Sequence, residues 1–230
     1  MKRSEINNAI KWAEQLLAQR RISLPPFAHR SATDWDAQRD ALIQKVMLGW
    51  DITDFGLGCF DRVGAVLFTV RNGEMGNPDS VPYCEKYILL KDGNCQEIPM
   101  HYHAFKTEDI INRGGGILCV QACGKNADGS VDRESPVEVY MDGVMRRFSP
   151  SEIIEIEPGA SIRLTPYLYH RLFAKTGAGD LVVGEVSRVN DDCNDNFFAS
   201  PVKRFCTPEE DEPKYRLLVS EYGLSASTAQ

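Results

Sequence analysis

The sequence lacks an apolar run of membrane-spanning length and has no cluster of basic residues. A transmembrane helix needs about 20 consecutive apolar residues. The formal net charge is −7 at pH 7, so the chain does not supply the clustered Lys and Arg side chains that bind a phosphate backbone. No apolar signal segment follows the basic first residues. We therefore expect a soluble cytoplasmic protein that binds neither membranes nor nucleic acids.

The sequence also lacks a Cys-x-x-Cys motif, although it contains seven cysteines. An odd number of cysteines without an export signal predicts free thiols in a reducing compartment. Cys119 and Cys123 lie in an apolar stretch, where a cysteine more often packs as a small hydrophobic residue than binds a metal. We nominate no cysteine as a nucleophile.

Helical periodicity is confined to the first part of the chain. Apolar residues recur at helical spacing over residues 6–17, with Ser4 as a possible cap and two arginines at the far end. After two prolines, residues 33–36 resemble a capping box, which predicts a second helix running through Leu42 and Val46 until Gly49.

Short β runs separated by turn residues replace the helical pattern from Gly56 onward. The hairpin signal is strongest at Asp142-Gly143, inside the alternating stretch 137–148. The other expected strands cover residues 65–70, 86–90, 117–122, 154–156, 162–164, 172–174 and 181–186. This spacing predicts a mainly β sandwich or barrel over residues 56–206, an N-terminal helical extension over 1–55, and a C-terminal segment over 207–230. Acidic residues 207–213 and the small polar tail 225–230 are expected to fray.

Histidine is scarce, and three of the four histidines fall into one pattern. His101 and His103 are two apart, so on a strand both imidazoles point to the same face, and Glu108 follows after a short bend. His170 shares its expected strand face with apolar residues, which places it inside the protein. Three imidazoles and one carboxylate suit Mn, Fe, Co, Ni or Zn. The alternative is a solvated histidine pair.

Two further charged residues are candidates for catalysis. Glu185 lies on an apolar strand face, where burial would raise its pKa toward the working range of a general base. The alternative is a buried structural pair with Lys or Arg. Lys106 lies between two expected ligands and is placed to donate to a developing oxyanion, unless it is a solvated lysine on the bend. Lys91 is a weaker candidate, which would bind substrate at the mouth of the barrel. The alternative is that Lys91 is an ordinary surface charge.

A polar stretch near the C-terminus has the composition of a ligand-binding loop. Residues 190–198 combine carboxylates, amides and two phenylalanines, which suits hydroxyl recognition and ring stacking. We take Asp191, Asp195 and Phe198 as candidate substrate-binding residues. A plain connecting loop would also be rich in Asn and Asp.

Two motifs in the chain resemble the metal-binding motifs of the cupin family, which has a jelly-roll β-barrel. The residues that carry this resemblance are Gly93, His101, His103, Glu108, Gly115, Pro166 and His170. Seven residues rather than five separate Gly93 from His101, and the second motif lacks its usual central glycine and one residue of spacing. The turn before His170 should therefore differ from the usual one, while His170 keeps its place as a ligand.

Within the cupins, residues 99–116 and 190–198 are similar to the D-lyxose isomerase family, and the similarity extends over nearly the whole chain. This resemblance implies a manganese-dependent aldose–ketose isomerase that interconverts D-lyxose and D-xylulose, with D-mannose and D-fructose as a slower pair. Gly114-Gly115-Gly116 precedes an expected strand rather than a helix, so it is no phosphate cradle and an unphosphorylated sugar is favoured.

Two other functions fit the same ligands. One is an Fe(II) cupin dioxygenase, because three histidines and one glutamate do not distinguish it from an isomerase. The other is a non-catalytic sugar-binding cupin, although the chain has no helix-turn-helix or basic segment to transmit a signal. Exposed edge strands in cupins commonly pair across a two-fold axis, so we expect a homodimer.

Overall fold

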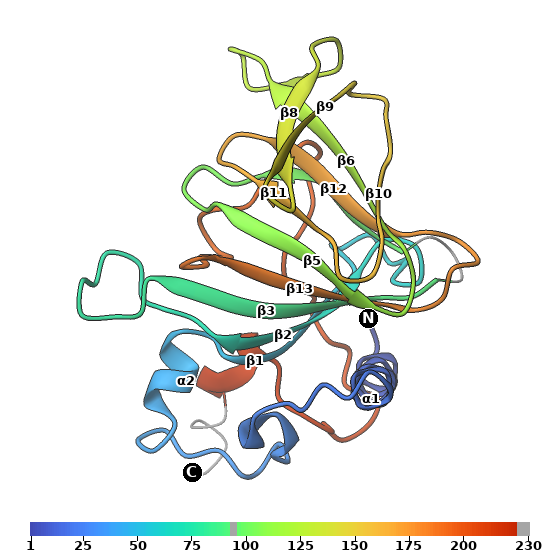
Figure 1. The fold of residues 1–230 in the computed structure, drawn as a ribbon. Helices are drawn as coiled ribbons and strands as arrows, with labels where there is room; N and C mark the ends of the chain where they lie inside the picture. Colours follow the sequence, from blue (N-terminus) through green and yellow to red (C-terminus); the bar gives the residue numbers. More distant parts are fainter. Residues whose placement is uncertain (93–95, 225–230) are drawn as a thin grey trace.

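The computed structural model describes residues 1–92 and 96–224, which form two curved antiparallel sheets next to an N-terminal helical region (Figure 1). The larger sheet has eight strands in the order β1 (Gly49–Thr53), β2 (Ala65–Arg71), β3 (Tyr83–Leu90), β13 (Leu181–Arg188), β5 (Glu108–Gly114), β11 (Ser161–Leu164), β8 (Val137–Met141) and β9 (Val144–Phe148). The smaller sheet has the order β10 (Ile154–Ile156), β6 (Leu118–Lys125), β12 (Tyr169–Ala174), β4 (Glu97–Tyr102) and β14 (Phe197–Phe198), and β7 (Val131–Asp132) pairs with β6. Mainly β architecture is thus confirmed.

Alternation along β2 shows how the larger sheet separates two cores. Ala65 and Leu67 pack in the cluster between the two sheets, whereas Val66 and Phe68 pack on the opposite face against the helical region. Side chains alternate across a strand, so a strand buried on both faces must be apolar throughout. The inner cluster forms the wall of the barrel, and the outer one attaches the N-terminal extension.

Helix α1 (Arg3–Gln19) covers the outer face of the larger sheet, near the predicted position. Its buried face carries the apolar residues Ile6, Ala9, Ile10, Ala13, Leu16 and Leu17. Ser4 does not cap the helix as expected, because its backbone N–H and hydroxyl both donate to the carboxylate of Asp211. The structure also places β1 in the sheet, so the N-terminal extension contributes a strand as well as helices.

The long second helix expected after residue 33 is wrong. The chain instead forms a 3-10 helix, η1 (Pro26–His29), and a five-residue helix, α2 (Ala41–Lys45). The carboxylate of Asp36 accepts backbone N–H bonds from Gln38 and Arg39, and that of Asp40 accepts one from Asp36. Such local side-chain bonds compete with helical ones, so residues 36–40 remain turns.

The acidic C-terminal segment is held against α1, contrary to the expectation that residues 207–213 fray. Arg3 pairs with both Glu210 and Glu221, and its backbone N–H donates to the carbonyl of Glu209. The final helix, η2 (Val219–Leu224), follows buried Leu217 and Leu218. The tail 225–230 lies outside the described residues.

Local backbone geometry confirms the hairpin and explains one glycine. Asp142 and Gly143 both have positive φ, 49° and 83°, as a two-residue turn between β8 and β9 requires. A Cβ on Gly115 would collide with the carbonyl oxygen of Asp180, so glycine permits this close approach of two loops.

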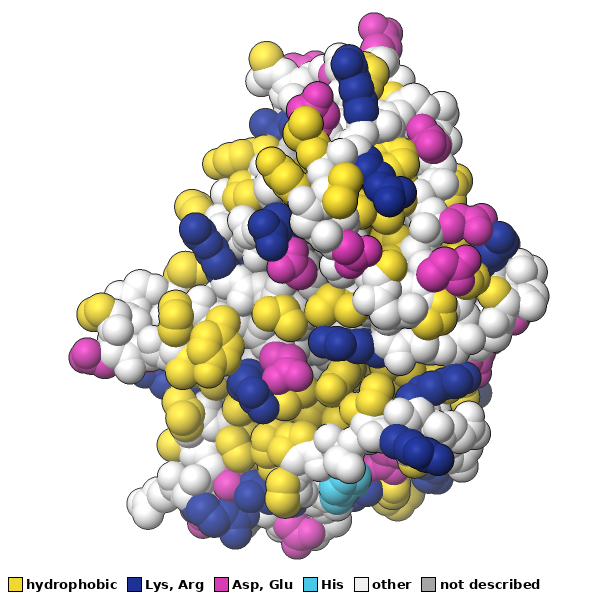
Figure 2. Space-filling model, in the orientation of Figure 1, with side chains coloured by type: hydrophobic (Ala, Val, Ile, Leu, Met, Phe, Trp, Pro, Cys, Tyr) yellow, Lys and Arg dark blue, Asp and Glu magenta, His cyan; other side chains and the backbone are white. Residues whose placement is uncertain are grey.

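Basic and acidic side chains are interspersed on the face drawn in Figure 2, and hydrophobic side chains lie among them over the end that carries β8 and β9. Exposed residues of this hairpin include Tyr140, Val144 and Met145. Within the described part of the chain, no helix has both the length and the apolar character needed to cross a bilayer.

Candidate metal centre and active site

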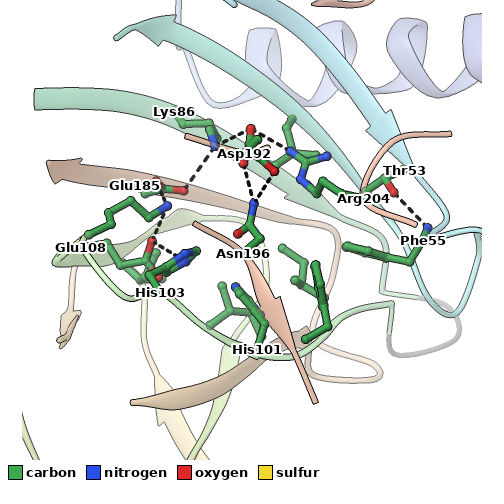
Figure 3. Close-up of a pocket in the computed structure, with 16 residues that line it drawn as sticks. Thr53, Phe55, Lys86, His101, His103, Glu108, Glu185, Asp192, Asn196 and Arg204 are labelled. Carbon is green, nitrogen blue, oxygen red and sulfur yellow. Dashed lines mark hydrogen bonds and ion pairs between the residues drawn. The ribbon is translucent and has the colours of Figure 1, made fainter. Parts of the chain in front are cut away.

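A cavity lined by residues of both sheets lies between them. Its lining divides into histidines with Glu108, an arc of charged residues above them, and apolar walls (Figure 3). The charged and polar residues are His101, His103, Lys106, Glu108, Lys86, Glu185, Asp192, Asn196, Arg204 and Thr53. The apolar walls are formed by Phe55, Leu67, Ile98, Ile110, Leu172 and Phe198.

The three histidines of the sequence pattern converge. His101 on β4 pairs directly with His170 on β12, so neighbouring antiparallel strands bring them together. One ring nitrogen from each of His101, His103 and His170 lies within 4.8 Å of the others. All three side chains are buried, and Leu172 and Ala174 share the inner face of β12 with His170.

The backbone fixes which ring nitrogen of each histidine carries the hydrogen. Nδ1 lies 2.8 Å from the Pro99 carbonyl oxygen in His101, 2.5 Å from that of Asp195 in His103, and 3.0 Å from that of Leu168 in His170. Because a carbonyl oxygen can only accept, each Nδ1 must donate in a neutral imidazole. The lone pair on Nε2 is therefore left for a ligand, as in metal-binding histidines.

Burial keeps the imidazoles of His101 and His103 neutral. Burial, assisted by neighbouring His170 and His103, holds the pKa of His101 well below its usual 6.5. For His103, burial and the charge of Lys106 lower the pKa to about 4. A neutral imidazole is the form that binds a metal ion.

Glu108 completes the cluster from β5. Its Oε1 lies 3.1 Å from Nε2 of His170, and its Oε2 lies 3.6 Å from Nε2 of His103. Although burial alone would raise the pKa of Glu108, the charge of Lys106 holds it well below 4.5. The carboxylate is therefore ionised.

The donor set fits a divalent first-row cation. Nε2 of His170 is buried and makes no hydrogen bond to any residue that the structure describes, despite the proximity of Glu108. A buried polar atom without a hydrogen bond is uncommon and indicates a missing partner. Three neutral imidazoles and a carboxylate suit such an ion and leave coordination positions for water or substrate.

Glu185 projects into the cavity as expected, but its predicted pKa is wrong in direction. Burial alone would raise the pKa, yet the charges of Lys106 and Lys86 outweigh it and hold the pKa below 4.5. Lys106 Nζ lies 2.8 Å from Glu185 Oε1, and the Ser187 hydroxyl donates to the same oxygen at 3.1 Å. Both the acid and its lysine partner are therefore charged.

Lys106 is buried rather than solvated. Its Nζ lies 2.8 Å from Glu185 Oε1, 3.0 Å from Glu108 Oε2 and 3.0 Å from Asn190 Oδ1. An ammonium has three N–H donors, and three oxygens surround this one. Lys106 is thus placed to position the two carboxylates, and no donor remains for an oxyanion in this arrangement.

Sequence reasoning missed the charged arc above the histidines. Lys86 lies opposite Glu185 in the pairing of β3 with β13, and Asp192 lies 3.5 Å from its Nζ. Arg204 bridges Asp192 at 3.0 Å and Asp51 at 2.7 Å. A signal for Lys86 did exist: the residue alternates with buried Cys84 and Ile88 on one strand face.

Of the four expected substrate residues, the structure places Phe198 in the cavity. The Phe198 ring lies 5.3 Å from that of His101. Lys91 lies beside Trp12 and Asp61, outside the cavity lining.

The two expected aspartates do not line the cavity either. The Asp191 carboxylate accepts backbone N–H bonds from its own turn. Buried Asp195 accepts backbone N–H bonds from residues 104–106. Lys91, Asp191 and Asp195 thus lie outside the cavity lining, and their contact with substrate stays a prediction.

The turn before His170 contains a residue in an uncommon backbone conformation. Tyr167 has φ 63°, in the left-handed region that favours glycine, and its backbone N–H donates to the carbonyl of His103 at 2.8 Å. This bond ties the turn to the strand that carries the histidine pair. Gly93, the first residue of the other motif, lies outside the described residues.

The cavity residues belong to a chain with close sequence relatives. A model of the D-lyxose isomerase family matches residues 1–222. A D-lyxose/D-mannose isomerase of Escherichia coli O157:H7 is 42% identical over 96% of this chain and 98% of its own length. One from Serratia proteamaculans is 43% identical over the same shares.

Solved structures support the fold at lower sequence identity. The L-ribose isomerase of Cellulomonas parahominis with L-ribose has a TM-score of 0.56 and 16% identity, covering 90% of this chain and 98% of the other. A mutant L-ribose isomerase of Acinetobacter sp. DL28 with L-ribose has a TM-score of 0.55 at 16% identity, covering 90% and 97%. The cupin-type barrel is confirmed, and the family match decides against the dioxygenase and the non-catalytic cupin. The chain belongs to the D-lyxose isomerase family and is a sugar aldose–ketose isomerase.

Proposed function

We propose that this enzyme interconverts D-lyxose and D-xylulose, and also D-mannose and D-fructose, with Mn²⁺ held by His101, His103, Glu108 and His170. The substrate pair is suggested by the names of the relatives, two D-lyxose/D-mannose isomerases. The observation that carries the proposal is one cavity lined by the imidazoles of His101 and His103, which cluster with that of His170, and by the ionised carboxylate of Glu185. Co, Ni, Fe or Zn also suit these ligands.

Isomerisation moves a proton between C2 and C1 while negative charge grows on O1 and O2. The bound cation would act as a Lewis acid and stabilise that charge. Glu185 accepts the proton from C2 of the aldose and returns it to C1. The hydroxyl proton of O2 passes to O1, so the C1 carbonyl becomes a hydroxyl and the C2 hydroxyl becomes a carbonyl. Because Glu185 is ionised, it is ready to act as the base without first losing a proton.

The other residues of the cavity hold the reactants in place. Lys106 fixes the orientation of Glu185 and keeps it ionised through their 2.8 Å contact. Phe198 and the other apolar wall residues offer a face for the carbon chain and limit access of water. Each cation of the charged arc faces a carboxylate, so no excess positive charge is available for a phosphate, which favours an unphosphorylated sugar.

We further propose a cytoplasmic homodimer. Strand β9 ends the larger sheet, and Val144 and Met145 on it are exposed. An exposed edge strand with apolar side chains is prone to pair with another chain. Light scattering of the purified protein tests the dimer.

The activity test uses metal-stripped protein in the absence of oxygen. Adding Mn²⁺ should restore formation of D-xylulose from D-lyxose, and of D-fructose from D-mannose at a lower rate. A His170→Ala variant should bind Mn²⁺ more weakly and show little recovery, whereas a variant of the exposed His29, His29→Ala, serves as the matched control. Full activity of the stripped protein in excess chelator would refute the metal requirement, and absence of ketose with Mn²⁺ bound would refute the proposed substrates.

A further inference from the structure

Lys86 occupies an unusual position for a lysine. It lies in the middle of β3, directly opposite Glu185 in the strand pairing, and only 2% of its surface is exposed. Figure 3 shows its side chain reaching toward Asp192 and Glu185 above the histidines. Burying an ammonium group is costly unless its hydrogen-bond donors find partners.

The contacts of Lys86 are too long to satisfy the group. Among the described residues, its Nζ has a hydrogen bond of 3.5 Å to Asp192 Oδ2 and an ion pair of 4.0 Å with Glu185 Oε2. Lys106, in the same cavity, has three oxygens at 2.8 to 3.0 Å. Lys86 therefore retains donor capacity in a cavity where buried donors are normally satisfied.

Asp192 provides a fixed acceptor beside this donor. Its Oδ2 accepts from Arg204 at 3.0 Å, and its Oδ1 accepts from the amide of Asn196 at 3.1 Å. Arg204 is anchored in turn by Asp51 at 2.7 Å. These bonds hold the Asp192 carboxylate from two sides and restrain it from moving toward Lys86.

We propose that Lys86 and Asp192 together bind the C3 hydroxyl of the sugar, with Lys86 donating to its oxygen and Asp192 accepting its hydrogen. This inference rests on the proposed function. A hydroxyl oxygen to one side of two atoms that are 3.5 Å apart can lie at ordinary hydrogen-bond length from both. O1 and O2 lie at the histidine end, and Glu185 addresses C2. Nζ of Lys86 lies 4.0 Å from Oε2 of Glu185. The hydroxyl that reaches Lys86 is then the one on C3, the carbon next to C2.

The contact of Lys86 and Asp192 with the C3 hydroxyl would make the enzyme selective for the configuration of the sugar at C3. D-Lyxose and D-mannose share the same configuration at C2, C3 and C4, so one donor and acceptor pair serves both. D-Arabinose differs from D-lyxose in configuration at C3 alone, and its C3 hydroxyl points away from the pair. A site built to bond a hydroxyl discriminates against a sugar that cannot supply it.

The experiment measures kcat/KM of the Mn²⁺-loaded enzyme for D-lyxose, D-arabinose and 3-deoxy-D-lyxose. For the wild type, removing the C3 hydroxyl should lower kcat/KM by about 10- to 100-fold. In the Lys86→Met variant, kcat/KM for D-lyxose should fall by a similar factor, whereas kcat/KM for the deoxy sugar should change little relative to the wild type. The ratio of kcat/KM for D-lyxose to that for D-arabinose should fall at least about tenfold. Lys86→Gln, which keeps a donor, should recover part of the preference.

Lys175→Met is the matched control, because Lys175 is exposed and pairs with Glu155 away from the cavity. Its sugar preference should equal that of the wild type. Equal losses on all three sugars in Lys86→Met, with the wild-type preference retained, would assign Lys86 a structural role and overturn the inference. Thermal unfolding and metal content show whether Lys86→Met is misfolded. If it is, the kcat/KM ratios between the three sugars are measured for Lys86→Gln instead. If the wild-type holoenzyme does not convert D-lyxose, the proposed function itself fails, which is a separate result.

Discussion

Nζ of Lys106 lies 2.8 Å from Oε1 of Glu185 inside the barrel. The same ammonium lies 3.0 Å from Oε2 of Glu108, so one cation is shared by the proposed base and a proposed metal ligand. Burial of two carboxylates near each other is unfavourable unless a positive charge lies between them. This arrangement keeps both acids ionised, and it links the charge at the metal centre to the basicity of Glu185.

Replacing Glu185 with glutamine should remove most of the activity, because an amide has the shape of the carboxylate but cannot accept the C2 proton. We expect kcat to fall by about 10²- to 10⁴-fold while bound Mn²⁺ is unchanged. Steady-state kinetics and elemental analysis of Glu185→Gln measure both. Glu155→Gln, at an exposed ion pair, is the control. A Glu185→Gln variant with more than about a tenth of wild-type kcat would exclude Glu185 as the base.

Asp195 should affect metal affinity without contacting the metal. Its carbonyl orients His103, and its carboxylate accepts three backbone N–H groups of residues 104–106. An amide at this position accepts fewer such bonds, so Asp195→Asn should weaken Mn²⁺ binding by about 10- to 100-fold. Competition with a metal-sensitive dye measures the affinity.

The matched control for Asp195 is Asp191→Asn, because Asp191 caps its own turn outside the cavity lining. Equal Mn²⁺ affinities of the two variants would contradict the role given to Asp195.

Transfer through Glu185 predicts exchange with solvent. A proton held by a carboxylate can exchange with water before it returns to C1, whereas a direct hydride shift retains the original hydrogen. We expect D-xylulose formed in D₂O to carry deuterium at C1, detected by NMR. Complete retention of protium at C1 would favour the hydride shift and remove the need for Glu185 as a base.

The buried pairing of Arg3 with Glu221 should be important for stability. Arg3 is fully buried, and removing its guanidinium would leave buried Glu221 with Lys214 as its remaining ion-pair partner. We expect Arg3→Met to lower the free energy of unfolding by about 3 to 5 kcal/mol, measured by urea denaturation. Arg146→Met on exposed β9 should change it by less than about 0.5 kcal/mol. A comparable effect of both variants would contradict the importance of the buried pair.

Asp40 should contribute a pH-dependent part of the stability. The hydrogen bond from Arg39, with help from Arg30 and despite burial, holds its pKa well below the ordinary 3.8. A group with a lowered folded-state pKa stabilises the protein above its unfolded pKa and loses this contribution as the pH falls toward the folded value.

The unfolding free energy of Asp40→Asn should therefore lie about 1 to 3 kcal/mol below that of the wild type at pH 6, and the gap should narrow below pH 4. Urea denaturation between pH 3 and 6 measures the gap, with Glu138→Gln, at an exposed position of β8, as the control. A gap that is independent of pH would show that Asp40 acts by packing alone.

Most of the barrel could be predicted because its signals are local. The Asp142-Gly143 turn and the alternation of β12 around His170 depend on neighbouring residues alone. The prediction of a long second helix was wrong because the side chains of Asp36 and Asp40 accept hydrogen bonds from the backbone of their own turn. The prediction that the C-terminal segment frays was wrong because Glu210 and Glu221 bind Arg3, which lies more than 200 positions away in the sequence.

The sequence by itself determined the three histidines and Glu108, since strand periodicity and motif spacing reveal which residues share a face. Tertiary structure decided the charge state of Glu185 and the recruitment of Lys86, Asp192 and Arg204. Burial favours the neutral form of Glu185, whereas nearby ammonium groups favour the ionised form. The pairing of β13 with β3 and the position of Lys106 bring two ammonium groups close enough for the ionised form to be the more stable. Electrostatic balance depends on distances between residues far apart in the chain, and periodicity along the chain carries no information about those distances.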